Sequence, residues 1–176
     1  MHFDVTDAFD LTLTPTGLVA ASAPARKAFW DAVETKYPGL SAACGCYMFC
    51  VKATHGALPW YVGQTSKNSF AGECFQPHKI NHYNTAVASK SKIKPQLFFF
   101  PKLTPSGKFS KLSKNKQNDI DFLETYLIGL ALERNPSLCN INKTAFLKNM
   151  YVPGIINAKA GQPTAAVVKV KSILGF

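Results

Sequence analysis

The sequence is poor in charged residues, and above all in acidic ones. Charged side chains make up 17% of the 176 residues, and only ten residues are Asp or Glu. Hydrophobic residues make up 47%, which is enough to build a packed core and excludes a chain that is disordered throughout. We therefore expect one globular domain with an appendage at most.

Long apolar runs and targeting signals are also missing. No run approaches the roughly 20 residues that a helix needs to cross a bilayer. The first residues, Met1 to Asp7, contain acids and no basic stretch of the kind that opens a secretory signal. We expect a soluble, cytoplasmic protein that uses neither a membrane nor an organic cofactor.

The five cysteines have no spacing typical of a disulfide framework. Cys44, Cys46 and Cys50 would share one face of a strand, opposite Tyr47 and Phe49. A thiolate zinc site is one interpretation, but no second cluster of Cys or His completes it. Buried, reduced thiols are the interpretation that we prefer.

Acidic residues are absent from one long window, Cys74 to Asn118, which carries +9 of the net charge of +10. A localised positive field of this kind suits DNA or RNA as a partner. A solubilising surface is the plainer alternative. The lysines that we expect to contact nucleic acid, one of them just before this window, are Lys67, Lys90, Lys92, Lys94, Lys108, Lys111, Lys114 and Lys116.

Local patterns predict a β-β-α-β-α core with an extension at each end. Gly56 and Pro59 are typical of the turn between two hairpin strands. Asn118 or Asp119 is the expected N-cap of the last core helix, and Ser22 that of a helix in the N-terminal extension. The expected elements are a short hairpin or extended arm at 3–19, helices at 24–36, 77–89 and 119–134, strands at 45–52, 59–64 and 95–102, and a late strand at 167–170. These elements divide the chain into an N-terminal extension (1–42), a core (43–143) and a C-terminal extension (144–176).

The central hairpin carries two short elements with tyrosines, Gly45-Cys46-Tyr47 and Tyr61-Val62-Gly63. A hairpin brings the two phenols close together. Paired phenols on rigid strands can position a water molecule or hold a phosphate. This arrangement favours an enzyme that cuts phosphodiester bonds.

Glu124 lies within the apolar stripe of its predicted helix, one turn from Ile120 and one turn from Ile128. A carboxylate on the core side is unfavourable unless it is paired or binds a metal. Glu124 is therefore either a metal ligand that points at the sheet or a structural carboxylate that meets a lysine or water. Periodicity alone does not separate these interpretations.

The first core helix carries the remaining candidates. Tyr83 faces the core, whereas His78 and His82 lie one turn apart on the other side. The two histidines are either half of a zinc site or surface residues near a phosphate backbone. Lys79 either reaches the hairpin and stabilises charge on a phosphate or lies extended along the edge of the core.

Taken in order, these features resemble the GIY-YIG nuclease superfamily. The resemblance covers roughly residues 43–143. Its motifs are Gly45-Cys46-Tyr47, Tyr61-Val62-Gly63-Gln64-Thr65, a basic helix, Phe122-Leu123-Glu124 and Asn140-Ile141-Asn142. It implies an α/β (α+β) fold with a small, mainly antiparallel three-stranded sheet flanked by helices. It also implies a metal-dependent endonuclease, with DNA the more expected substrate than RNA.

The resemblance also implies roles for single residues. Tyr47 would be the general base or orient the attacking water, and Tyr61 would line the same pocket and contact the phosphate or a metal-bound water. Glu124 would be the only protein ligand of one Mg²⁺ or Mn²⁺, and Asn140 a supporting contact. Because a tyrosine of pKa ~10 is a poor base in water, a nearby cation has to lower its pKa or a relay has to accept the proton.

The chain departs from the family at one position, because the arginine of the first helix is missing. The only arginines, Arg26 and Arg134, lie elsewhere. The nearest cation is Lys79, with His78, His82 and Tyr83 around it. Lysine supplies charge but not a bidentate fork. Either Lys79 or a histidine substitutes in a divergent nuclease, or the chain is a nucleic-acid-binding module that cuts weakly or not at all. A structural protein whose lysines only aid solubility is a third hypothesis.

Overall fold

The computed structural model describes residues 1–54, 56–88, 90, 92–113, 115, 117–152 and 163–175. Contacts divide the chain into two compact units, Met1–Cys139 and Asn140–Phe176. The first unit holds the sheet, the helices that pack on it and most of the candidate site residues. The division at residues 42 and 143 that the sequence suggests stays a prediction.

An antiparallel sheet forms the centre of the first unit. Its long strands are β3 (Gly45–Ala53), β4 (Gly56–Thr65) and β5 (Lys94–Leu103), and β3 lies between the other two. These are the three strands that the sequence predicts, and pairing of Ala53 with Gly56 extends the hairpin up to its turn. The predicted fold class, a mixed fold with a mainly antiparallel sheet flanked by helices, is confirmed.

Two short strands extend the sheet beyond the three expected. β1 (His2–Phe3) and β2 (Phe9–Asp10) both pair antiparallel with β5. The N-terminal segment therefore contains both forms that the sequence left open, an extended arm along β5 and then a tight reversal in which Leu13 pairs antiparallel with Val19. Phe9 and Leu11 bury their side chains in the core, and this burial favours pairing of the arm with β5.

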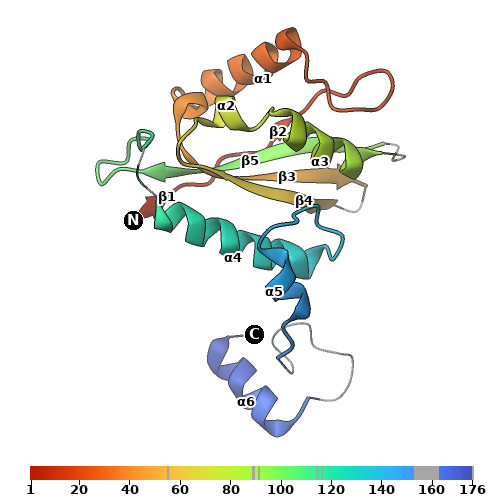
Figure 1. The fold of residues 1–176 in the computed structure, drawn as a ribbon, viewed down its shortest axis with the longest axis vertical. Coiled ribbons are helices and arrows are strands. Elements are labelled where there is room, and N and C mark those ends of the chain that lie inside the picture. The colour runs from red at the N-terminus through yellow and green to blue at the C-terminus, as the bar shows by residue number, and fades with distance from the viewer. Residues whose placement is uncertain are drawn as a thin grey trace. The chain divides into compact units, whose positions relative to one another are not determined.

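Helices cover both faces of this sheet, as Figure 1 shows. α1 (Ala23–Lys36), α2 (Phe70–Glu73) and α3 (Pro77–Val87) lie on one face, and α4 (Asn118–Arg134) lies on the other. Ser22 caps α1 as expected, because its side chain accepts a hydrogen bond from the N–H of Ala25. None of the helices in the described part of the chain is long and apolar enough to cross a membrane.

The two faces of β3 belong to different apolar clusters. Tyr47 and Phe49 join the larger cluster on the side of α1 and α3, whereas Cys44 and Cys46 pack with Ile120 of α4. All five cysteines are free, and four of them are buried. The prediction of buried, reduced thiols is therefore confirmed for those four.

The predicted N-cap of α4 is wrong. Gln117, rather than Asn118 or Asp119, precedes the first helical residue, and its side chain makes no capping hydrogen bond. The Gln117 amide donates instead to the carbonyl of Ser66 at 3.3 Å. The Asp119 carboxylate lies inside the helix and pairs with Lys102 at 2.7 Å. Tertiary contacts therefore take both side chains away from the helix end.

The described part of the second unit contains α5 (Thr144–Asn149), the bridge residue Val152 and α6 (Ala165–Leu174), in that order. The late strand predicted at 167–170 is therefore wrong. Thr164 accepts a hydrogen bond from the N–H of Val167, and Gly175 ends α6 with a φ of 80°, so both helix ends are capped. β-Branched residues favour a strand mainly where neighbouring side chains cover them, and no side chain of α6 is buried.

Candidate active site

Two glycines fix the place of the Tyr47 ring. Gly63 pairs with Tyr47 across the hairpin, and a Cβ on Gly63 would lie 2.4 Å from Cζ and 2.5 Å from Oη of that ring. Gly45 has a φ of +150°, and a Cβ there would lie 2.2 Å from the carbonyl oxygen of Phe100. Packing against the neighbouring strands therefore requires the glycine of each tripeptide.

Tyr47 lies inside the core. Its ring has no exposed surface, and its centroid lies 6.2 Å from that of Tyr61 and 6.5 Å from that of Phe70. Its hydroxyl makes no hydrogen bond of standard geometry to the described residues. Burial raises the pKa of Tyr47 well above its usual value, so the phenol keeps its proton at neutral pH. Tyr47 is thus suited to donate a hydrogen bond rather than to act as a base.

A lysine, a phenol and a carboxylate meet at the edge of this core. Lys79 of α3 donates a hydrogen bond from Nζ to Oη of Tyr61 at 2.6 Å. The same Nζ lies 3.4 Å from Oε1 of Glu73, and the two side chains are only 10% and 16% exposed. Because bulk water does not surround the ammonium group of Lys79 there, no water replaces Tyr61 and Glu73, and these two partners hold the group in place.

The charges of this group are strongly coupled. Burial acts to lower the pKa of Lys79, but the hydrogen bond to Tyr61 and the charge of Glu73 outweigh it, so that pKa lies above its usual value. Burial raises the pKa of Tyr61, and Lys79 offsets this only in part. At neutral pH Lys79 is therefore an ammonium ion and Tyr61 a neutral phenol.

His82 extends the group towards the surface. Its ring stacks on Tyr61 at a centroid distance of 4.9 Å and an interplanar angle of 13°. Burial, and then the charges of Lys79 and His78, lower the pKa of His82. Its imidazole is therefore neutral at pH 7 and able to accept a proton. His78, one turn earlier, is exposed.

Tyr83 supports the site from below. Its ring is fully buried and stacks on Phe49 at 4.2 Å, while its edge-to-face contact with Tyr61 spans 6.2 Å. Burial raises the pKa of Tyr83 well above its usual value. Tyr83 therefore fixes the orientation of the Tyr61 ring as a packing partner.

Glu124 approaches the group from the other layer. α4 packs against β4 and β3, and the Glu124 side chain is half-buried. Its negative charge contributes to the raised pKa of Tyr61, so the carboxylate acts on that phenol across the edge of the sheet. Helix periodicity alone left this contact open.

Asn140 belongs to the second compact unit. Its backbone carbonyl accepts a hydrogen bond from the hydroxyl of Thr144 at 3.1 Å. The supporting role that the resemblance implies for Asn140 stays a prediction.

Glu73 is the residue of this group that the sequence did not reveal. It is the only acidic residue between Glu34 and Asp119, and that isolation within a basic region is the one signal that singles it out. Two further side chains hold its carboxylate, since Gln76 and Asn68 donate to Oε2 at 2.9 Å and 3.4 Å.

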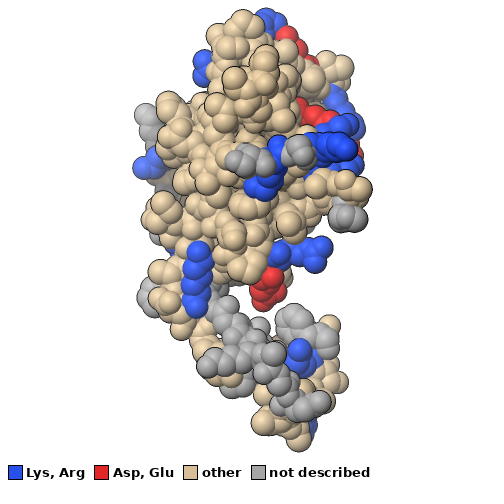
Figure 2. All heavy atoms as spheres, turned by 90° about the vertical axis from the view of Figure 1, so that its right-hand side faces the viewer, with Lys and Arg blue, Asp and Glu red and all other residues tan. Residues whose placement is uncertain are grey.

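The basic window divides into two groups at opposite ends of the sheet. At one end, Lys52 and Lys94 pair across β3 and β5, and Lys92 is exposed beside them. Figure 2 views this end and shows basic side chains gathered on it. Lys90 is held nearby, because its Nζ bonds to the carbonyl of Ala86 and lies 4.2 Å from the ring centroid of Trp60.

The second group follows the other ends of β4 and β5. Lys67, Lys108 and Lys111 are exposed there, and a hydrogen bond of 3.2 Å from Ser113 to Ser66 joins the two loops. Lys114 and Lys116 lie outside the described residues. The expected positive surface therefore has two parts, separated by the length of the strands.

Comparisons with known proteins add no identification, since no family model, curated protein or solved structure matches this chain.

Proposed function

We propose that this chain is a nuclease that hydrolyses phosphodiester bonds in nucleic acid, with DNA as the first substrate to test. The main support is the direct contact between Lys79 and Tyr61, which come from separate segments. Lys79 donates a hydrogen bond to Tyr61 at 2.6 Å, and the charge of Glu124 on α4 acts on the same phenol. A cation held against a phenol, within reach of a carboxylate charge, suits the charge that develops on a phosphate during hydrolysis.

Lys79 supplies the positive charge in this proposal. Its Nζ is already held at 2.6 Å from Tyr61 and 3.4 Å from Glu73. A phosphate oxygen that reaches Tyr61 therefore meets an ammonium ion that needs little reorganisation. Lysine provides this charge at one point, without the two parallel hydrogen bonds of an arginine.

The residues present fit one hard divalent cation. Mg²⁺ usually takes one or two carboxylates, several waters and the substrate phosphate, and Glu124 is a half-buried carboxylate beside the group. Among the described residues, no three His, Cys, Asp or Glu side chains lie together as a metal cage, so Glu124 would be the protein ligand. Mg²⁺ or Mn²⁺ bound there would stabilise charge on the leaving oxygen.

His82 and Tyr47 take different roles from their surroundings. His82 is neutral at pH 7 because burial lowers its pKa, so it can accept a proton from the attacking water. Tyr47 keeps its proton because burial raises its pKa. In this proposal Tyr47 supports the Tyr61 ring by packing, and His82 is the base.

Two observations favour the second candidate, a nucleic-acid-binding module without catalysis. The Tyr47 ring has no exposed surface, and Glu73 already partners the lysine that stands where the family has arginine. With both side chains engaged in this way, the two lysine groups would bind a phosphate backbone with no cleavage.

The experiment compares cleavage and binding in the same set of variants. Supercoiled plasmid and a structured RNA are incubated with Mg²⁺, Mn²⁺ or EDTA, and binding is followed by fluorescence anisotropy over a range of salt concentrations. Glu124→Ala and Tyr61→Phe are expected to lower the cleavage rate by about 10²–10³-fold with little effect on binding. Glu133→Ala and Tyr126→Phe are matched controls, because both side chains are exposed on α4.

Each outcome selects one candidate. Metal-dependent cleavage that is lost in Glu124→Ala and Tyr61→Phe but kept in both controls supports the nuclease. Salt-sensitive binding without cleavage of either substrate supports the binding module. Binding that does not depend on salt would reject both and leave the lysines a role in solubility.

A further inference from the structure

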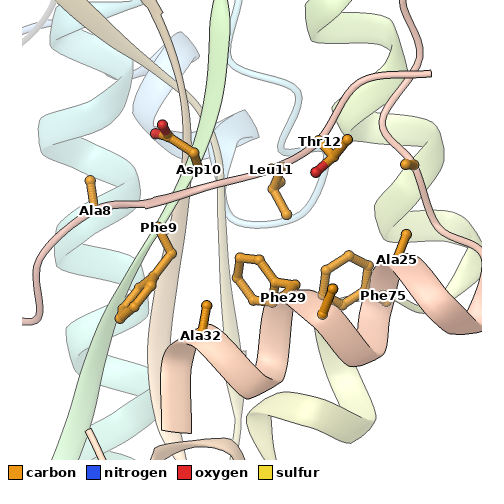
Figure 3. Close-up of a pocket in the computed structure, with 11 residues that line it drawn as sticks. Ala8, Phe9, Asp10, Leu11, Thr12, Ala25, Phe29, Ala32 and Phe75 are labelled. Carbon is orange, nitrogen blue, oxygen red and sulfur yellow. The ribbon is translucent and has the colours of Figure 1, made fainter. Parts of the chain in front are cut away.

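A hollow lies between the N-terminal arm and α1, and neither Tyr47 nor Tyr61 lines it. Its volume is about 430 Å³, within the range of natural ligand sites. Figure 3 shows Phe9, Phe29 and Phe75 turned into it, with Ala25 and Ala32 of α1 facing the arm. The floor is therefore apolar, and the small side chains of α1 leave it open.

One wall of this hollow is an unused strand edge. The N–H of Leu11 donates to the carbonyl of Pro95 in β5, so Leu11 and Phe9 direct their backbone groups towards β5. In an antiparallel pair the intervening residues direct theirs the other way, so Ala8 and Asp10 point away from the ladder. Among the described residues, no hydrogen bond from outside the ladder reaches the backbone of Ala8 or Asp10.

Contacts limit the open edge at both ends. On the N-terminal side of Ala8, the open edge ends at Asp7, whose carboxylate accepts a hydrogen bond of 2.8 Å from the hydroxyl of Tyr37 at the end of α1. At the far end, the N–H of Ala20 donates to the carbonyl of Thr12 at 2.8 Å. The edge between them spans about four residues, or roughly 13 Å of strand. That length suits a short extended segment.

Charge indicates which residues such a segment would carry. In Figure 3 the Asp10 carboxylate lies on the opposite side of the arm from Phe9, and the Asp10 side chain is exposed. Asp10 accepts one hydrogen bond, from Gln96 at 2.7 Å, and its remaining lone pairs can accept from a basic residue, whereas Asp7 is already paired with Lys36. Residues directly opposite each other in neighbouring strands share a face, so a basic residue would face Asp10 while its neighbours enter the apolar floor.

We propose that this groove binds an extended peptide, with alternating apolar and basic residues, as an additional strand along Ala8–Leu11. Backbone hydrogen bonds to Ala8 and Asp10 hold the peptide, and the floor formed by Phe29, Phe75 and the alanines of α1 selects its apolar side chains. The occupant is a protein segment and not nucleic acid. This proposal does not depend on the nuclease site.

The test uses the whole chain labelled with ¹⁵N and a synthetic probe, an acetylated and amidated hexapeptide in which valine and lysine alternate. Saturable shifts of the Ala8 and Asp10 amide signals are expected, together with slower hydrogen exchange at both amides. The same hexapeptide with every backbone nitrogen methylated cannot donate those hydrogen bonds in either strand orientation and is expected to bind at least about tenfold more weakly.

Two leucine variants of α1 test the floor. Ala28 lines the hollow, so Ala28→Leu should overpack it and weaken binding by about tenfold. Ala23 lies on the same helix outside the hollow, so Ala23→Leu should bind as the wild type does. Leucine is nearly as good a helix former as alanine, so both variants should keep α1, and their unfolding temperatures check this.

Three results would overturn the proposal. The first is the absence of saturable shifts at millimolar peptide, and the second is equal binding of the N-methylated peptide. The third is a response at Phe29 and Phe75 without one at the amides of Ala8 and Asp10, which would mean that the hollow takes a small apolar molecule and not a strand.

Discussion

Gly63→Ala should destabilise the protein through a single steric contact. The new Cβ would lie 2.4 Å and 2.5 Å from two atoms of the Tyr47 ring, about 1 Å inside normal contact between carbon atoms. The ring cannot swing into solvent, because Tyr47 is fully buried and Phe70 packs against it. Overpacking of a core usually lowers the free energy of unfolding by about 1–3 kcal/mol, and the rigid surroundings place this case near 3 kcal/mol.

Thermal unfolding measures this effect. For a chain of this size, each kcal/mol shifts Tm by about 2–4 °C, so Tm should fall by roughly 6–12 °C. Gly72→Ala is the matched control, because Gly72 lies in α2 and a Cβ there would lie 3.6 Å from its nearest neighbour, an ordinary contact. That variant should keep Tm or raise it slightly, since alanine favours a helix.

A double-mutant cycle tests the stated cause. Tyr47→Leu removes the ring atoms that the alanine would strike, so Gly63→Ala should lower stability by less than about 1 kcal/mol in that background. Equal losses of stability in both backgrounds, or no loss in the wild type, would show that the Tyr47 ring does not explain the glycine at position 63.

The other predictions concern buried titrating groups. Glu73→Gln leaves the buried ammonium of Lys79 with a weaker partner, and urea titration at neutral pH should show a loss of about 1–3 kcal/mol. The folded protein raises the pKa of Lys79 above 10.5, so the wild type should lose the stability that comes from the charged Lys79 as the pH rises through that raised value. The variant should lose less stability over the same pH range. Equal losses of stability at alkaline pH in the two proteins would contradict the pairing of Lys79 with Glu73. Burial and the charge of Lys79 lower the pKa of His82, so its NMR signals should titrate below pH 6.5. Stability should fall as the pH drops through that range, because the unfolded chain binds the proton first. A titration midpoint of His82 above pH 6.5 would refute this prediction. Burial raises the pKa of Cys50 to about 12, so iodoacetamide should label the less buried Cys139 first. Mass spectrometry of the labelled protein would show the order. Rapid labelling of Cys50 would contradict its burial.

Elements with strong local signals could be predicted from the sequence. Gly56 and Pro59 predict the hairpin, although both lie within β4 in the structure, and Ser22 is the predicted N-cap that begins α1. These signals lie within a few residues of the structure that they specify. The contact of Lys79 with Tyr61 was one of two interpretations, because helix spacing shows which way a lysine points but not what it meets.

Features that depend on distant contacts could not be predicted. Pairing of the arm with β5 joins residues far apart in the chain, and no local pattern encodes it. Glu73 lies only six residues before Lys79, but the turn at Gln76 between α2 and α3 brings them together, and no helix pattern spans that turn. α6 contains a β-branched run that suits a strand, but without a sheet to cover it the caps at Thr164 and Gly175 prevail.

The arm along β5 sets an order of events during synthesis. Asp10 and its hydrogen-bond partner Gln96 are 86 residues apart, so at about 5–20 residues per second the arm waits roughly 4–17 s for β5 to be made. During that time Phe9 and Leu11 have no partner strand, and we expect the nascent chain to expose them to chaperones. Closure of the sheet at this edge then becomes a late event, one that a slower ribosome delays and a fused N-terminal partner can hinder.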